Sequence, residues 1–356
     1  MDAKGGDLGS APHGLASDEN QPHRGPQDTS SISANSLGLS VSNSEDVDDD
    51  ADSAIGDIYR PDSTSSMTSS VYKSVEEFGR TWHRYKQGKY FMPNDEIEQT
   101  RLDIQHAVSM KLFGKLYFAP LENPKRVLDL GTGTGIWATE FASMHPGAEV
   151  IGTDLSPIQP NYVPPNCTFE VDDIEDDWSF TDPFDYVHLR YMCASIRDAP
   201  RLIRTIYENL TPGGYLEFQD YAGQVTSIDG TADDSALVRW HGLLIDAVRK
   251  MGPDACQAPN YKRWMQEAGF VDVWEQRYAV PNNTWAKGRD KKELGMMQVA
   301  NISGGLSGMT TKLFVTQLGM EVGEIDKLVE NVKKDMLDKS IHSYWPAIVV
   351  LGRKPL

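Results

Sequence analysis

A glycine-rich segment in the first half of the chain carries the clearest chemistry in the sequence. Residues Val127–Gly135 read VLDLGTGTG, a short apolar run that ends in glycines at every second position. A buried strand, a glycine turn and a helix together can bind a nucleotide-like cofactor, because glycine allows positive φ and a close approach of the ligand to the backbone. The residues of this turn that we expect to contact a cofactor are Gly131, Thr132, Gly133 and Gly135.

An acid in the same segment separates two kinds of cofactor. Asp129 stands two residues before the first glycine. Dinucleotide-binding turns use the spacing G-x-G-x-x-G to hold a pyrophosphate, which a neighbouring carboxylate would repel. The same carboxylate attracts the ammonium of an amino acid. Asp129 and the spacing G-x-G-x-G therefore favour a cofactor with a cationic amino-acid end over the nicotinamide dinucleotide of an oxidoreductase.

Two further acids follow the next two predicted strands. Asp154 ends EVIGTD, and an acid at that place can accept hydrogen bonds from the two hydroxyls of a ribose. Asp173 follows CTFEV and is expected to accept from an adenine amino group, while the backbone at Ile174 donates to the ring. Leu155 is expected beside the cofactor as well. The alternative interpretations are a turn aspartate for Asp154 and a plain acidic loop for Asp173.

These acids and glycines have to be positioned by alternating strands and helices, and the sequence supplies them from residue 126 onward. Strands alternating with amphipathic helices predict a parallel sheet covered on both faces. The predicted strands are residues 126–130, 149–155, 167–173, 184–191, 214–221, 271–280 and 344–352. The predicted helices between them are residues 136–145, 200–210, 236–252 and 261–269.

The segment before the first strand of the sheet, residues 71–120, is called the leader segment below. Phe78, Trp82 and Tyr85 recur at spacings of four and three, which predicts a helix over residues 72–89. Pro93 interrupts that pattern, and Asn94 or Asp95 can cap a second helix. The expected buried stripe of this second helix is Ile97, Leu102, Ile104, Val108, Leu112 and Leu116.

The combination resembles the class I methyltransferases that depend on S-adenosylmethionine (SAM). The carrying motifs are VLDLGTGTG, an acid after each of the next two strands, FDYVHLR and TPGGYLEFQDY. The stretch WHRYKQGKYFMPNDEIEQTRLDIQH, the segment DLSPIQP and the terminal GRKP resemble the LaeA-like methyltransferases of filamentous fungi. The resemblance covers roughly residues 75–356 and implies a protein of secondary metabolism, either a tailoring enzyme or a regulator.

The resemblance implies a fold and a cofactor. The fold is a Rossmann-like, seven-stranded, mostly parallel sheet with a C-terminal antiparallel strand and an N-terminal helical lid. The cofactor is SAM. In such folds the leader segment closes over the cofactor, so Tyr90 and Arg101 become candidates for its amino-acid end. The alternative is that Tyr90 only packs and that Arg101 pairs with Glu98 or Glu96.

The sequence names no catalytic base. Methyl transfer from a sulfonium needs a base only if the acceptor must lose a proton, and positioning supplies most of the acceleration. Weak candidates at the carboxyl edge of the predicted sheet are His188, Tyr191 and Asp220. No spacing of His, Cys or carboxylates matches a metal site, and we expect none.

Charge and composition limit the partners. The chain has 356 residues and a net charge of −18, of which residues 1–70 contribute −10 from 13 acids and 3 bases. No basic cluster predicts nucleic-acid binding, and no apolar run is long enough for a membrane span. The N-terminus lacks a secretory signal, so we expect a cytoplasmic or nuclear protein.

Composition also suggests a division of the chain. Residues 1–70 are acidic and Ser-rich, and we expect a disordered tail that is either a solubility aid or a docking segment for a protein partner. Residues 71–120 form the lid, and residues 121–356 form the methyltransferase domain, with an insertion at about 282–340. The first functional hypothesis is a tailoring methyltransferase with a small-molecule acceptor. The second is a regulator that acts through protein partners.

Overall fold

The computed structural model describes residue 38 and residues 74–356. Expectations for residues 1–70 therefore lie outside the described part of the chain, apart from residue 38. Among the described residues, the strands are β1 (Ser74–Glu77), β2 (Arg80–His83), β3 (Arg126–Leu130), β4 (Glu149–Asp154), β5 (Cys167–Val171), β6 (Phe184–Arg190), β7 (Leu210–Tyr221), β8 (Thr226–Ser227), β9 (Val271–Pro281) and β10 (Ser343–Arg353). The helices are α1 (Glu96–Phe113), α2 (Ile136–Met144), α3 (Ala199–Glu208), α4 (Ala236–Met251), the 3₁₀ turn η3 (Ala258–Asn260), α5 (Tyr261–Glu267), α6 (Arg289–Leu313), the π-helical turn η4 (Phe314–Leu318) and α7 (Val322–Leu337).

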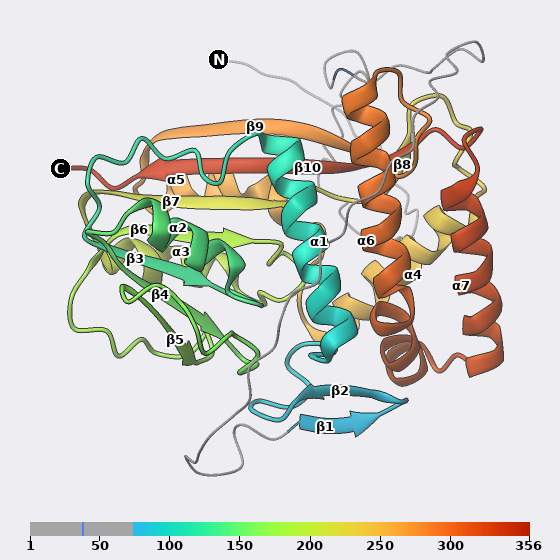
Figure 1. The fold of residues 1–356 in the computed structure, drawn as a ribbon, viewed down its shortest axis with the longest axis horizontal. Helices are drawn as coiled ribbons and strands as arrows, with labels where there is room; N and C mark the ends of the chain where they lie inside the picture. The colour runs from blue at the N-terminus through green and yellow to red at the C-terminus, as the bar shows by residue number, and fades with distance from the viewer. Residues whose placement is uncertain (1–37, 39–73) are drawn as a thin grey trace, which may run out of the picture. The chain divides into compact units, whose positions relative to one another are not determined.

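A central mixed sheet organises these elements (Figure 1). Its strand order is β5-β4-β3-β6-β7-β10, with β9 on the outer edge of β10. The pairs from β5 to β7 are parallel, and β10 is antiparallel to both β7 and β9. Tyr344 pairs with Thr226 and also with Pro281, so the short β8 shares the β7 edge of β10. The sheet is thus seven positions wide, and the predicted fold class is confirmed.

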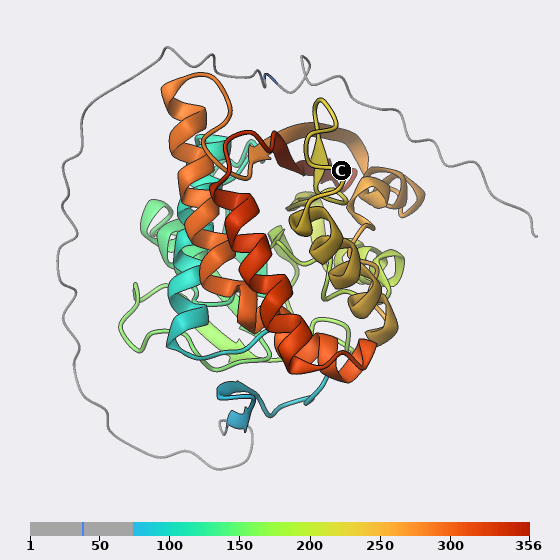
Figure 2. The ribbon, with the colours of Figure 1, turned by 90° about the vertical axis from the view of Figure 1, so that its right-hand side faces the viewer.

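Alternating side chains of the strands pack into two apolar layers. Val127, Val150 and Tyr186 pack with α2 on one face. Leu128, Leu130 and Leu189 pack with α3 and α5 on the other face. A third apolar cluster is formed by α4, α6, α7 and Trp345 of β10. Figure 2 shows these three helices grouped together. Among the described residues, no helix is long and apolar enough to cross a membrane.

The leader segment departs from its predicted structure at its start. The helix expected over residues 72–89 is wrong, because residues 74–83 form the hairpin β1–β2 with Glu77 opposite Arg80. The two loop residues between them, Phe78 and Gly79, have φ of 51° and 70°. Positive φ at both central residues is the geometry of the two-residue hairpin turn that suits twisted strands. Phe78 is 47% exposed at this turn, whereas Trp82 is buried, so the two share no helix face.

The second leader helix begins where the sequence predicts. The Asp95 side chain caps α1 by accepting from the Glu98 backbone N–H at 3.1 Å. Its predicted apolar stripe is wrong at Ile97, which is 58% exposed, whereas Val108 and Leu116 are buried as expected. The buried face of α1 is largely polar and comprises Glu98, Arg101, Gln105, His106, Val108 and Ser109. A buried polar face requires internal partners, and these partners define the site.

Candidate functional site

A cavity lies at the carboxyl edge of the parallel strands. In the sheet, β4 and β6 flank β3 on opposite sides, so the chain changes direction there, and open α/β sheets bind ligands at such a point. The cavity is lined from the sheet side by the glycine turn after β3 and by residues that follow β4, β5, β6 and β7. Residues of the leader segment and of α6 also line it. The expected site residues that line it are Tyr90, Arg101, Gly131, Gly133, Asp154, Leu155, Asp173, Ile174, Tyr191 and Asp220.

The three glycines of the turn have different structural roles. Gly131, Gly133 and Gly135 all have positive φ, at 72°, 58° and 77°. Gly131 and Gly133 line the cavity. A Cβ at Gly135 would stand 2.4 Å from the Phe169 ring of β5, so this glycine allows the start of α2 to pack on the sheet. Gly135 is thus a packing position and does not line the cavity.

The acid before the turn is buried and already bonded. Asp129 accepts from the Thr132 hydroxyl at 2.6 Å and contacts Nδ1 of His188 at 2.7 Å. The His188 ring stacks on Trp137, with centroids 3.8 Å apart. Asp129, Thr132 and His188 line a smaller hollow beside the main cavity, bounded also by Gly131 and Gly133. His188 therefore lies beneath the glycine turn and does not line the main cavity.

Asp154 lies at the end of β4, and part of its capacity to accept hydrogen bonds is unused. Its two oxygens accept from the backbone N–H groups of Gly133 at 3.0 Å and Ser156 at 2.9 Å. A carboxylate has about four lone-pair positions, so others remain for a ligand in the cavity. Burial raises the pKa of this carboxyl to about 6.

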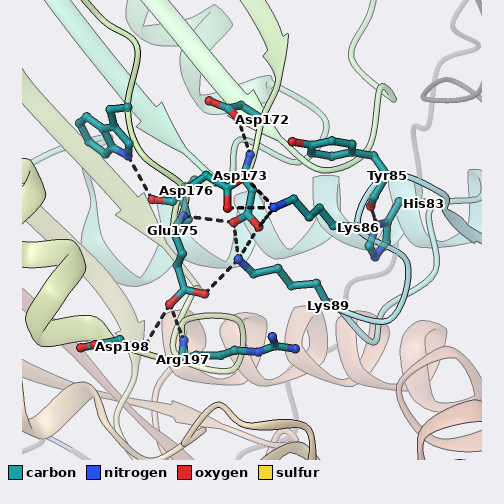
Figure 3. Close-up of polar contacts among 12 residues, drawn as sticks. His83, Tyr85, Lys86, Lys89, Asp172, Asp173, Glu175, Asp176, Arg197 and Asp198 are labelled. Carbon is teal, nitrogen blue, oxygen red and sulfur yellow. Dashed lines mark hydrogen bonds and ion pairs between the residues drawn. The ribbon is translucent and has the colours of Figure 1, made fainter.

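Asp173 in the loop after β5 is held by lysines from the leader segment (Figure 3). Lys89 forms a close ion pair with Asp173 and contacts Glu175 at 3.2 Å. Lys86 lies 3.6 Å from Asp173. Burial tends to raise the pKa of Asp173, but the Lys89 ammonium and the Glu175 N–H outweigh it, and the net pKa is lowered. These lysines carry no spacing signal in the sequence.

The two leader residues proposed from the resemblance reach the cavity in different states. Tyr90 lines the cavity, and burial raises the pKa of its hydroxyl. Arg101 makes two hydrogen bonds to the carboxylate of Glu98, at 2.8 and 2.9 Å, and a third to Asn301 at 2.8 Å. Its charge is therefore balanced within α1. The pairing of Arg101 with Glu98 is the alternative that the sequence left open, although here it is buried.

The candidates after β6 and β7 face the cavity. The Tyr191 hydroxyl contacts the Ser109 hydroxyl at 2.8 Å. Asp220 accepts from the Met192 backbone at 3.1 Å and from the Tyr261 hydroxyl at 3.2 Å. Burial raises the pKa of Asp220 to about 7. This carboxyl is thus poised near neutral pH inside the cavity.

The far wall of the cavity is apolar and aromatic. It is built by Tyr221, His241, Leu244, Val248, Ile302, Met309 and Trp345. Tyr221 stacks on Trp345, with centroids 4.8 Å apart, and His241 meets the Trp345 ring edge to face at 4.6 Å. Burial lowers the pKa of His241 to about 3, so it is neutral there. Leu244, Val248 and Trp345 carry no site signal in the sequence, because the wall is assembled from four separated elements with no shared spacing.

A family model described as a methyltransferase domain matches residues 104–275. The chain is 41% identical over 298 residues to the methyltransferase pytC of Aspergillus terreus, and the alignment covers 82% of this chain and 92% of that protein. It is 33% identical over 297 residues to the probable methyltransferase tdiE of Emericella nidulans, covering 82% and 93%. It is 34% identical over 286 residues to the protein-methionine methyltransferase laeA of the same species, covering 79% and 76%.

The fold and the matched domain make the protein a class I methyltransferase, an enzyme whose methyl donor is SAM. The chain belongs to the LaeA-like family of fungal secondary-metabolism methyltransferases, which includes the relatives above. The glycine turn and Asp154 suit that cofactor, because they offer a close backbone approach and free acceptor positions for hydroxyl groups.

Proposed function

We propose that this protein methylates a small, largely apolar molecule of a fungal biosynthetic pathway. One observation carries the proposal: a single cavity joins a polar edge, formed by the glycine turn and Asp154, to a wall of Tyr221, Ile302, Met309 and Trp345. An acceptor that enters this wall region is surrounded by apolar and aromatic surface, as in most small-molecule sites.

In this proposal Asp154 accepts from the ribose hydroxyls, and Gly131 and Gly133 let the cofactor approach the backbone. Asp173 and Ile174 lie toward the adenine, with Lys89 fixing the Asp173 carboxylate. The cofactor supplies a methyl group bound to a sulfonium, and the thioether that leaves is uncharged. The residues of the chain therefore act by holding the acceptor in line and by excluding water, which can supply about 7–11 kcal/mol of the barrier reduction.

The first test is cofactor binding to the purified full-length chain by titration calorimetry. We expect SAM to bind and Asp154→Ala to weaken it by about 10- to 100-fold, the range of a lost hydrogen bond to a charged group. Arg201→Met, an exposed change away from the cavity, serves as the matched control. Absence of binding heat at millimolar SAM contradicts the proposal, as does unchanged affinity in Asp154→Ala.

The second test concerns the acceptor. Metabolite extracts of strains with and without the gene are compared by mass spectrometry, and we expect at least one pair of compounds that differ by one methyl group. The same extracts, incubated with the purified protein and SAM carrying an isotopically labelled methyl group, should yield the labelled product. If the label enters only protein, the small-molecule acceptor is wrong.

A protein acceptor or a regulatory role through partners is the second candidate. It is favoured by the relatives named laeA, one of them a protein-methionine methyltransferase and others secondary metabolism regulators. The tail of residues 1–70 is the proposed docking element for such a partner. Deleting it should abolish partner capture and leave SAM affinity unchanged, because the cavity is lined by residues 89–345. A deletion without effect on partners removes the tail from this role.

A further inference from the structure

Arg190 at the end of β6 has a partly buried, positively charged side chain with an unused hydrogen-bond donor. Its side chain lines both the main cavity and the smaller hollow beside the glycine turn. Nη2 donates to Nδ1 of His106 at 2.8 Å. Nη1 is buried and, within the described part of the chain, has no hydrogen-bond partner. Buried donors are almost always satisfied, so this atom requires an explanation.

The guanidinium also lacks a paired carboxylate among residues 74–356. Asp129 and Glu140 are the acids whose charges act on it. Asp129 is bonded to Thr132 and His188, and Glu140 contacts the other side of His106. An unpaired buried charge is costly, and a binding site is one place where such a cost persists until a ligand of opposite charge arrives.

His106 fixes the direction of the free donor. Burial and the neighbouring Arg190 charge lower the pKa of His106 to about 3, so the ring is neutral. Arg190 can only donate, and Nδ1 of His106 must therefore accept, which places the ring proton on Nε2. That Nε2–H points to a Glu140 oxygen at 3.2 Å. Nη2 of the Arg190 guanidinium is thus occupied by His106, and Nη1 is left for a ligand.

We propose that Arg190 binds the carboxylate of the methyl donor's amino-acid end, with His106 as the residue that positions it. This inference deepens the proposed function and rests on it. Asp129 lines the same hollow, so the site offers a cation and an anion to the two charges of an amino acid. The assignment replaces Arg101, whose guanidinium is neutralised by Glu98.

The experiment compares ligands that differ only at the amino-acid end. SAM, decarboxylated SAM and 5′-methylthioadenosine are titrated into the full-length protein and its variants by calorimetry. For the wild type, we expect SAM to bind at least about 10-fold more tightly than decarboxylated SAM. Arg190→Met should weaken SAM by about 10- to 100-fold, should abolish the preference for SAM over decarboxylated SAM, and should leave 5′-methylthioadenosine unchanged.

Three further variants keep the test decisive if Arg190→Met does not fold. Arg190→Lys keeps the charge without the fork and should lose part of the preference. His106→Ala should reduce the preference for SAM while 5′-methylthioadenosine still binds as before, whereas His106→Asn, which keeps an acceptor, should restore part of it. Arg263→Met, on the exposed side of α5, is the matched control and should match the wild type.

Each contrary outcome is distinct. If folded Arg190 variants keep the wild-type preference for SAM, the inference is overturned. If Arg190→Met leaves SAM affinity unchanged and weakens only a carboxylate-bearing acceptor, the anion belongs to the acceptor and the assignment to the methyl donor is overturned. If neither SAM nor 5′-methylthioadenosine binds the wild type, the proposed function itself fails.

Discussion

The Asp154 carboxyl gives cofactor binding a pH dependence. Its pKa in the free protein is raised by burial to about 6, and only the ionised form keeps both oxygens as acceptors for ribose hydroxyls. A ligand that prefers the ionised form binds less well as the pH falls through that pKa. We therefore expect SAM affinity, measured by calorimetry between pH 8 and pH 5, to decrease below about pH 6.

Asp154→Asn is the control for this dependence. The amide keeps the shape of the side chain but does not titrate, so the variant should bind SAM more weakly and with a flatter profile. An Asn variant that retains the wild-type decrease below pH 6 would assign the titration to another group of the cavity.

The Asp220 carboxyl is expected to govern turnover if the acceptor is a hydroxyl. With a pKa of about 7, it can take a proton from the acceptor, so kcat should rise with pH through that value. Asp220→Asn should lower kcat by about 10²- to 10⁴-fold with SAM affinity unchanged. Single-turnover kinetics with labelled SAM measure both quantities.

Tyr261→Phe distinguishes a base from a structural acid at this position. The Tyr261 hydroxyl donates to Asp220 at 3.2 Å and favours its ionised form. Its removal should raise the Asp220 pKa and move the pH profile of kcat to higher pH. A Phe variant that is destabilised but has an unshifted profile would indicate that Asp220 only supports the loop after β6.

At the scale of elements, the approach of α6 to α1 depends on glycine at one position and not at its neighbour. A Cβ at Gly305 would stand 2.4 Å from Cδ of Arg101, whose side chain is fixed by Glu98 and Asn301. Nothing lies within 4 Å of a Cβ at Gly304. Gly305→Ala should destabilise by about 1–3 kcal/mol, whereas Gly304→Ala should stabilise by about 0.5–1 kcal/mol.

Denaturant unfolding of the two alanine variants provides the measurement. Because both changes lie in the same helix, the intrinsic preference of alanine is common to them and the difference reports the contact with α1. Equal effects of the two substitutions would show that α6 does not pack on Arg101 as described.

The leader segment is held to the loop after β5 mainly by Lys89. Asp173 is 2% exposed, so Lys89→Met leaves a buried carboxylate short of its main partner and should cost about 1–3 kcal/mol of unfolding free energy. Because the pKa of Asp173 is lowered by Lys89, this stability is present above the ordinary carboxyl pKa and is lost as the pH falls through the lowered value. The deficit of the variant should shrink in acid.

Lys86→Met is the matched comparison, because Lys86 pairs mainly with the half-exposed Asp176. We expect it to change the unfolding midpoint little. An equally large loss in both variants would mean that the cluster acts through its summed charge and not through the buried Lys89–Asp173 pair.

Features with local signals were predictable at this scale, and features that depend on distant partners were not. The glycine turn and the Asp95 cap were read from neighbouring residues. The Phe78–Gly79 turn was missed because the aromatic spacing was read as helical, although the glycine after Phe78 was an available hairpin signal. The polar buried face of α1 was hidden, since its partners Asn301 and Arg190 lie about 200 and 84 residues away from the residues they contact.

For the whole molecule, the order of the sheet followed from the alternation of strands and helices together with the family resemblance. The cavity did not follow, because its far wall comes from β7, α4, α6 and β10. A ligand that binds in the cavity should stabilise the folded chain, because it contacts both the sheet and this wall. At about 100 times its dissociation constant, SAM should stabilise the folded chain by about 2.7 kcal/mol, and a nicotinamide dinucleotide should not. Thermal unfolding with each ligand tests this, and a shift only with the dinucleotide would contradict the cofactor.

The position of β10 has a consequence for biosynthesis. Among the described strands, β9 pairs only with β10, and β10 follows both β7 and β9 along the chain. While the chain is being translated, one edge of β7 and the whole of β9 remain unpaired until β10 has been made. Nascent chains should therefore expose unpaired strand edges until β10 has left the ribosome, and they are expected to engage chaperones at that stage.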